Sequence, residues 1–400
     1  MIVLHNFYAY LPTSQNWAYK LVRHTPATKT LVYASEYLKT NFYSGDITYL
    51  NDGLPGLNDA RRRYAEGRGW RERWLYGVLT AVEKLVLAYH KSAYLQELRH
   101  HRVDIVHSHF ATVAIGKKNL IKRSGCRHVV SFYGYDYEMA PRADPSIMSA
   151  YRQLFVEADA FVCEGNNGAR ILADYGCPEH KIHVIKLGIE PGKVTPQVGN
   201  KDSGQLRLIQ IANYTEKKGH IYSLRAFAKA LPHCPGLRLT LVGSAKRPED
   251  QLVAAEVVTA IERLGLSHAV ELVASIDYSR LSTYLQDFDV FIHPSCYAEN
   301  YDCEGGAPVV ILDAQAAGLP VISTRHCDIP DEVLDQVTGL LSPEKDVEAL
   351  AKSIVAFYNM SNDSYQRFSK AAVHHVASEY NVANSGEKLA TLYKSLLAGK

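Results

Sequence analysis

The chain has 400 residues, of which 22% are charged and 47% hydrophobic, values typical of a soluble globular protein with room for two domains. Its formal net charge of +2 favours neither nucleic acids nor strongly acidic partners. The seven cysteines form no Cys-x-x-Cys pair, which favours reduced thiols and a cytoplasmic location, and no apolar run reaches the length of a membrane span.

The first strand is expected at Ile2–Leu4, and a helix is expected to begin near Trp17. Between them lie polar residues that would stand at the start of this helix, namely Thr13, Ser14, Gln15 and Asn16. We interpret Ser14, Gln15 and Asn16 as part of one wall of a binding cleft. A hydroxyl of Thr13 or Ser14 that simply caps the helix explains the segment equally well.

A basic and aromatic patch, Arg61–Trp74, precedes an apolar helical pattern that runs to Tyr94. Arginine mixed with tryptophan beside an apolar helix suits a surface that touches anionic lipid headgroups. The patch therefore predicts peripheral contact with the inner face of a membrane. The alternative is a solvated basic helix face whose apolar side lies in the protein core.

Two apolar strands end in polar loops, within Val103–Phe110 and again within Val129–Asp136. In open parallel sheets, ligands bind beyond the carboxyl ends of the strands. The residues expected to face the cleft are therefore His109, Tyr133, Gly134 and Asp136. His107 and His109 share a face of their strand, as a metal-binding pair would, but no third ligand of suitable spacing is apparent, and we expect no metal.

Proline, glycine and charged residues without apolar rhythm predict an interdomain linker at 193–205. Alternating strands and helices on either side predict an α/β protein of two parallel-sheet, Rossmann-like domains, at 1–192 and 206–383, that face a central cleft. In the second half, polar or glycine residues follow the expected strands, namely Asn213, Lys218, Gly243 and Ile276 with its neighbours.

The segment on which our interpretation depends most runs from Ser295 to Asp328. Glu304 precedes a turn, here called the glycine turn, made of Gly305, Gly306, Ala307 and Pro308. The turn leads into an apolar helix that stops at Gly318, so its backbone N–H groups favour an anion such as a phosphate. Glu304 and Asp313 flank that position, and carboxylates are suited to accept hydrogen bonds from hydroxyls. A nucleotide sugar offers both groups; an ordinary capped helix with solvated acids is the alternative.

The run Glu-Gly-Gly-Ala-Pro-Val, followed by Asp-Ala-Gln-Ala, resembles the acidic signature of retaining nucleotide-sugar glycosyltransferases of family four, also called glycosyl transferases group 1. Within that family it is similar to enzymes of surface-polysaccharide synthesis. The resemblance is strong from Leu206 to Leu341 and loose before it. It implies the GT-B fold, in which a last helix, here 384–400, packs back on the acceptor-side first domain.

The resemblance also implies roles for residues of the second half. Glu304 would contact the donor sugar, Asp313 the ribose and Lys218 the diphosphate, while Asn213, Gly243, Ile276 and the glycine turn would complete the donor site. This chain departs from the family pattern at three places. Asp313 is aspartate instead of glutamate and lies one residue further from Glu304, Asn213 replaces an arginine, and Tyr133 replaces a histidine. Lys217 or Arg325 would be the substitutes for the missing arginine.

The activity that the resemblance implies is retaining, metal-independent transfer of a sugar from a UDP- or GDP-linked donor, without a cofactor. The acceptor would be a hydroxyl of a glycan or a lipid-linked molecule. Two alternatives stay open from the sequence. One is a nucleotide-sugar epimerase or hydrolase of the same fold, and the other is a non-catalytic subunit that binds glycan or nucleotide.

Overall fold

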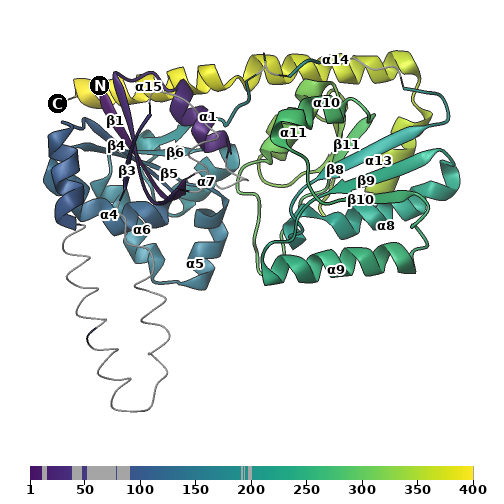
Figure 1. The fold of residues 1–400 in the computed structure, drawn as a ribbon, viewed down its shortest axis with the longest axis horizontal. Coiled ribbons are helices and arrows are strands. Elements are labelled where there is room, and N and C mark those ends of the chain that lie inside the picture. The colour runs from purple at the N-terminus through teal and green to yellow at the C-terminus, as the bar shows by residue number, and fades with distance from the viewer. Residues whose placement is uncertain are drawn as a thin grey trace, which may run out of the picture.

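The computed structural model describes residues 1–10, 16–37, 47–51, 78, 91–190, 192, 194–196 and 201–399. In this part of the chain, strands and helices alternate and build two α/β units that lie side by side, each on its own parallel sheet (Figure 1). The expected class, two Rossmann-like domains, is therefore confirmed. Ser14, Gln15 and the patch Arg61–Trp74 lie outside the described residues.

The first sheet has seven strands in the order β3-β2-β1-β4-β5-β6-β7, and every neighbouring pair is parallel. Its strands are β1 (Ile2–Tyr10), β2 (Lys29–Tyr37), β3 (Ile47–Asn51), β4 (Ile105–His109), β5 (Arg127–Ser131), β6 (Ala160–Cys163) and β7 (Ile182–Val184). β1 continues well beyond the expected Ile2–Leu4 because it lies between two neighbours and pairs with both. The strand order reverses between β1 and β4, which is where open α/β sheets bind ligands.

The second sheet repeats this plan with the order β10-β9-β8-β11-β12-β13. Its strands are β8 (Leu206–Ile211), β9 (Leu237–Val242), β10 (Val270–Val273), β11 (Val290–His293), β12 (Val321–Thr324) and β13 (Gly339–Ser342). The strands β11 and β12 are buried throughout, as apolar strands covered on both faces should be. The corresponding reversal of order lies between β8 and β11.

Helices connect the strands and cover both sheets (Figure 1). In the first domain they are α1 (Asn16–His24), α4 (Ala111–Ser124), α5 (Ala140–Ala143), α6 (Ile147–Glu157) and α7 (Asn166–Asp174). In the second they are α8 (His220–Ala230), α9 (Pro248–Arg263), α10 (Leu281–Leu285), α11 (Val309–Ala317), α12 (Ile329–Glu332) and α13 (Val347–Asn359). Among the described residues, no helix combines the length and the apolar character that crossing a membrane requires.

Two C-terminal helices run along one side of both domains (Figure 1). The helix α14 (Asn362–Glu379) packs against α11 of the second domain. The helix α15 (Val382–Ala398) lies against α1, and its Leu389 and Tyr393 are buried in one cluster with Val3 and Ile105 of the first sheet. The end of the chain therefore contributes to the core of the first domain.

Candidate active site

A largely buried ion pair, Lys218 and Glu304, lies at the cleft side of the second sheet, with 19% of the Lys218 side chain and 7% of the Glu304 side chain exposed. The Lys218 ammonium contacts both carboxylate oxygens of Glu304, at 2.7 and 2.9 Å, and the Ser295 hydroxyl donates to the same carboxylate at 2.7 Å. Burial alone would raise the pKa of Glu304, but the charge of Lys218, the His293 ring 3.8 Å away and the charge of Lys217 hold this pKa well below its usual range. Glu304 is thus a fixed negative charge in a site that solvent hardly reaches.

Lys218 reaches this position because the chain turns sharply after it. Gly219 has φ +69°, and a Cβ there would lie 2.0 Å from the Pro294 carbonyl oxygen. Only glycine combines that backbone conformation with so close an approach. The expected Lys-Gly pair therefore brings the loop after β8 directly onto the loop after β11.

The glycine turn is packed against the first domain. A Cβ on Gly305, which has φ +80°, would lie 2.2 Å from the Gly134 Cα, and a Cβ on Gly306 would lie 2.1 Å from an oxygen of Glu164. The Asn167 side chain donates to the Gly305 carbonyl at 2.9 Å. The two domains are therefore closed on each other at the position where the sequence predicts an anion site.

The helix that follows the turn is α11, and its ends agree with the sequence pattern. Pro308 precedes the first helical residue, Val309, and Gly318 ends the helix in the left-handed conformation, with φ +100°. Ala307 lies beside the interdomain contact and lines a small cavity there with Glu164. The helix start is thus aimed at the junction of the domains, where its dipole favours negative charge.

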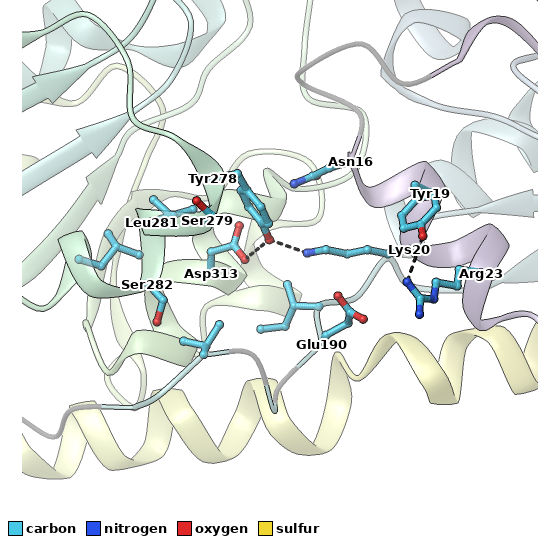
Figure 2. A pocket seen from close by; sticks show the side chains of 13 residues that line it. Asn16, Tyr19, Lys20, Arg23, Glu190, Tyr278, Ser279, Leu281, Ser282 and Asp313 are labelled. Carbon is cyan, nitrogen blue, oxygen red and sulfur yellow. Dashed lines mark hydrogen bonds between the residues drawn. The ribbon is translucent and has the colours of Figure 1, made fainter. Parts of the chain in front are cut away.

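Asp313 lies in a separate cavity of about 480 Å³ between the domains (Figure 2). Its Oδ1 accepts a hydrogen bond from the Tyr278 hydroxyl at 3.2 Å, and that hydroxyl accepts one from the Lys20 ammonium at 2.6 Å. Burial raises the pKa of Asp313, while the charge of Lys20 and the hydrogen bond from Tyr278 oppose the rise. The cavity is lined by residues of both domains, including Asn16, Lys20, Arg23, Glu190, Tyr278 and Asp313.

Two further residues of the predicted donor site lie near these loops without opening into the cavity. A Cβ on Gly243, just after β9, would lie 2.1 Å from the Ala212 carbonyl oxygen, so glycine is needed there for packing. Ile276 packs against the core of the second domain, two residues before Tyr278. Tyr278 itself was not singled out from the sequence, although its place in the same loop is the signal that could have identified it.

The cations proposed to replace an arginine at Asn213 have other partners. Lys217 contacts the Asp302 carboxylate and the Cys303 carbonyl oxygen, both at 2.9 Å. Arg325 forms an ion pair with Asp335 at 2.6 Å. Asn213 accepts a hydrogen bond from the Ser244 hydroxyl at 3.3 Å.

In the first domain, only part of the predicted cleft-facing set reaches the second domain. Gly134 does so, since a Cβ there would lie 2.5 Å from the Glu304 carbonyl oxygen. His109 and Asp136 differ from the expectation, because both are fully buried and hold the loop from inside. His109 is hydrogen-bonded to the Tyr133 hydroxyl at 2.8 Å, and Asp136 accepts the Tyr133 N–H at 3.1 Å. They position Gly134 rather than offer their own side chains to the cleft.

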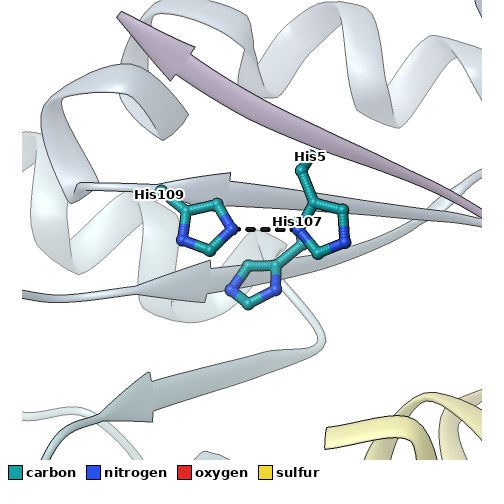
Figure 3. A group of neighbouring side chains, drawn as sticks. All are labelled: His5, His107 and His109. Carbon is teal, nitrogen blue, oxygen red and sulfur yellow. Dashed lines mark hydrogen bonds between the residues drawn. The ribbon is translucent and has the colours of Figure 1, made fainter. Parts of the chain in front are cut away.

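The sequence shows no third ligand of suitable spacing for His107 and His109, but the structure brings His5 beside them. His5 pairs with His107 in the register of β1 and β4, and ring nitrogens of all three lie within 4.8 Å of one another (Figure 3). The rings of His107 and His109 are stacked 4.2 Å apart with planes only 21° from parallel. Imidazole lone pairs lie in the ring plane, so those of His107 and His109 point along two nearly parallel planes.

The ring nitrogens of this histidine stack instead have hydrogen-bond partners. His5 Nδ1 lies 3.0 Å from His109 Nε2, and His107 is bonded to the hydroxyls of Ser131 and Tyr393. Burial lowers the pKa of His5 to about 3, so its ring is neutral near pH 7. The arrangement fits a hydrogen-bonded stack beneath Tyr133.

Comparison with protein families gives two adjoining matches. Residues 193–375 match the family described as "Glycosyl transferases group 1", and residues 56–193 match the one described as "Glycosyltransferase Family 4". The chain belongs to the family-four glycosyltransferases. The predicted membership is therefore confirmed across both domains.

Curated relatives of this glycosyltransferase include enzymes named for the biosynthesis of colanic acid and of amylovoran. The putative colanic acid biosynthesis glycosyltransferase WcaL of Escherichia coli K12 is 29% identical over 74% of this chain and 71% of its own length. The amylovoran biosynthesis glycosyltransferase AmsK of Erwinia amylovora is 30% identical over 62% of this chain and 59% of its own length.

Solved structures share the fold of this glycosyltransferase along its whole length. A glycosyltransferase from Rickettsia africae has a TM-score of 0.73 at 16% identity and covers 100% of this chain and 99% of its own. HepE from Anabaena, solved with UDP-glucose, has a TM-score of 0.73 at 14% identity and covers 100% of both chains. At such identities these structures show the GT-B fold alone.

Proposed function

We propose that this glycosyltransferase moves a sugar, with retention of configuration, from a nucleoside diphosphate donor to a hydroxyl of a glycan or lipid-linked acceptor in surface-polysaccharide synthesis. The observation that carries the proposal is the largely buried Lys218–Glu304 pair beside the glycine turn. The names of WcaL and AmsK support the product class, and the complexes of HepE with UDP and UDP-glucose support the donor class.

In this proposal each charged residue meets one part of the donor. Glu304 accepts hydrogen bonds from hydroxyls of the donor sugar, and its lowered pKa keeps it ionised at neutral pH. Lys218 turns from Glu304 toward the diphosphate and neutralises the charge that develops as the bond to the sugar breaks. The N–H groups at the start of α11 bind the same diphosphate, and Asp313 holds the ribose.

The proposed chemistry uses the leaving group as its base. The acceptor hydroxyl attacks the face of the sugar from which the diphosphate departs, and a phosphate oxygen takes the proton of that hydroxyl. Lys218 and the helix start provide the positive charge at the diphosphate, so the proposal includes no divalent ion. Closure of the domains excludes water, which limits hydrolysis of the donor.

The test is the release of UDP or GDP from the corresponding nucleotide sugars, measured with and without lipid-linked oligosaccharide acceptors. We expect release that depends on the acceptor, and a fall of about a hundredfold or more in Glu304→Gln, since preorganised electrostatic contacts are worth that much. Glu299→Gln, an exposed carboxylate of the same loop, should stay within about twofold. The anomeric configuration of the product, read by NMR, tests retention.

Two other outcomes identify the alternative functions. Conversion or hydrolysis of the donor at the same rate without an acceptor indicates an epimerase or hydrolase. Donor binding without turnover under any of these conditions indicates a non-catalytic subunit, a function that the Asn213 and Tyr133 substitutions keep open. Full activity of Glu304→Gln contradicts the assignment of the site.

A further inference from the structure

The proposed donor site has no cation at Asn213, where the resemblance to family four implies an arginine. Asn213 occupies that place, and its side chain bonds to Ser244. Lys217 and Arg325 contact carboxylates at 2.9 and 2.6 Å, so recruiting either would leave a carboxylate without its cation. Since a diphosphate carries charge at both phosphates, Lys218 alone leaves the phosphate nearer the nucleoside without a matching cation.

The first domain places a lysine on the opposite wall of the Asp313 cavity. Lys20, on the second turn of α1, is only 6% exposed, and its ammonium lies 2.6 Å from the Tyr278 hydroxyl (Figure 2). The same hydroxyl contacts Asp313 at 3.2 Å, so it bridges Lys20 and the carboxylate that is proposed to hold the ribose. Arg23, three residues further along α1, lines the same cavity.

The two walls of this cavity match two parts of one ligand. Asp313 on the second domain can accept hydrogen bonds from hydroxyls of a ligand. Lys20 on the first domain can bind an anionic group next to those hydroxyls. A ribose that carries a 5′-phosphate has this pattern, and a volume of about 480 Å³ lies within the range of small-molecule sites. Lys218 and Glu304 would then act at the sugar end of the donor.

We propose that Lys20 binds the phosphate nearest the nucleoside of the donor, and so replaces, from the first domain, the arginine that Asn213 has displaced. This inference rests on the proposed function. In the present structure the Tyr278 hydroxyl occupies the position on Lys20 and Asp313 that the donor would take. Donor binding would therefore displace the Tyr278 hydroxyl from Lys20 and Asp313. The donor itself would then contact both residues and connect the two domains.

The experiment is calorimetric titration of the full chain with UDP, GDP, uridine and guanosine at low salt. In Lys20→Met we expect the affinity for the preferred diphosphate to fall about tenfold or more, the usual worth of a hydrogen bond to a charged group. The affinity for the matching nucleoside should change less than about threefold, and Lys20→Arg should restore most of the diphosphate binding.

Two controls separate this role from a structural one. Lys118→Met removes a lysine of the same domain that pairs with Glu157 at 3.1 Å, and it should leave both affinities unchanged. Tyr278→Phe removes the hydroxyl to which Lys20 donates, and it should keep the preference for diphosphate over nucleoside. An equal loss of diphosphate and nucleoside binding in Lys20→Met, or no loss of either, overturns the inference while the proposed function stands. A wild-type protein that binds none of the four compounds contradicts both.

Discussion

Asp136 hydrogen-bonds to the backbone in the structure instead of facing the ligand cleft, where it was expected. Its carboxylate is completely buried and accepts the Tyr133 N–H. Burial raises the pKa of Asp136 to about 7, although the backbone N–H groups of Tyr133, Ala111 and Thr112 oppose the rise. The side chain thereby holds the start of the loop after β5 through its hydrogen bond with Tyr133.

This raised pKa predicts a stability that depends on pH. Between about pH 4, where an unfolded aspartate ionises, and about pH 7, the folded protein holds a proton on Asp136 that the unfolded chain has released. The folded state binds more protons in this window, so the contribution of Asp136 to stability is largest at low pH and is lost as pH rises.

We expect the difference in unfolding free energy, wild type minus Asp136→Asn, to decrease by up to about 1.4 kcal/mol per pH unit across this window. Urea denaturation at several pH values measures it. A difference that rises with pH, or stays flat, would show that Asp136 does not hold its proton in the folded protein.

At the scale of single residues, the sequence identified site residues that belong to a recognisable loop motif. It did not identify residues whose roles depend on partners far away in the chain. Lys218 and Glu304 were both assigned to the donor site from their loops, and the structure brings them to 2.7 Å. His5 was missed because its closeness to His107 follows from the pairing of β1 with β4, about 100 residues away. Asn167 and Tyr278 were missed because their roles arise only when the domains meet.

The helix α15 links the end of the chain to the first sheet. Leu389 is completely buried in one cluster with Val3 and Ile105, and the Tyr393 hydroxyl bonds to His107. The resemblance to family four implied a last helix at 384–400 that packs back on the first domain. Apolar periodicity alone could not predict this docking, because it marks an apolar face of a helix without saying what covers it.

Removal of this packing should destabilise the first domain. Leu389→Ala leaves a cavity among buried side chains, and we expect it to lower the free energy of unfolding by about 2–5 kcal/mol. The neighbouring exposed position provides the control, Lys388→Ala, which should change it by less than about 0.5 kcal/mol. Similar urea midpoints for the two variants would contradict the docking of α15 on this core.

Across the whole molecule, the closed domains leave no room for a side chain between Gly134 and the glycine turn. Gly134→Ala would place a methyl group 2.5 Å from the Glu304 carbonyl oxygen, where neither backbone can yield without domain movement. We expect a larger radius of gyration in small-angle X-ray scattering and, since misplacement by about 1 Å can cost a hundredfold, a loss of activity of that order.

The matched control for domain closure is Gly116→Ala in α4, where a Cβ would meet nothing within 4 Å. This change should leave the scattering curve unaltered and stabilise the helix by about 1 kcal/mol at most. An unaltered radius of gyration in Gly134→Ala would show that the two domains can accommodate the methyl group without opening.

We propose that the glycine turn and the Lys218–Glu304 pair bind an activated sugar, and a crystal structure with a bound UDP- or GDP-sugar is the decisive test. We expect diphosphate oxygens within hydrogen-bond distance of Lys218 and of the N–H groups from Gly305 to Ala307, with the ribose on Asp313. A donor bound elsewhere, with Lys218 still paired to Glu304 and Gly134 still packed on the turn, would contradict it.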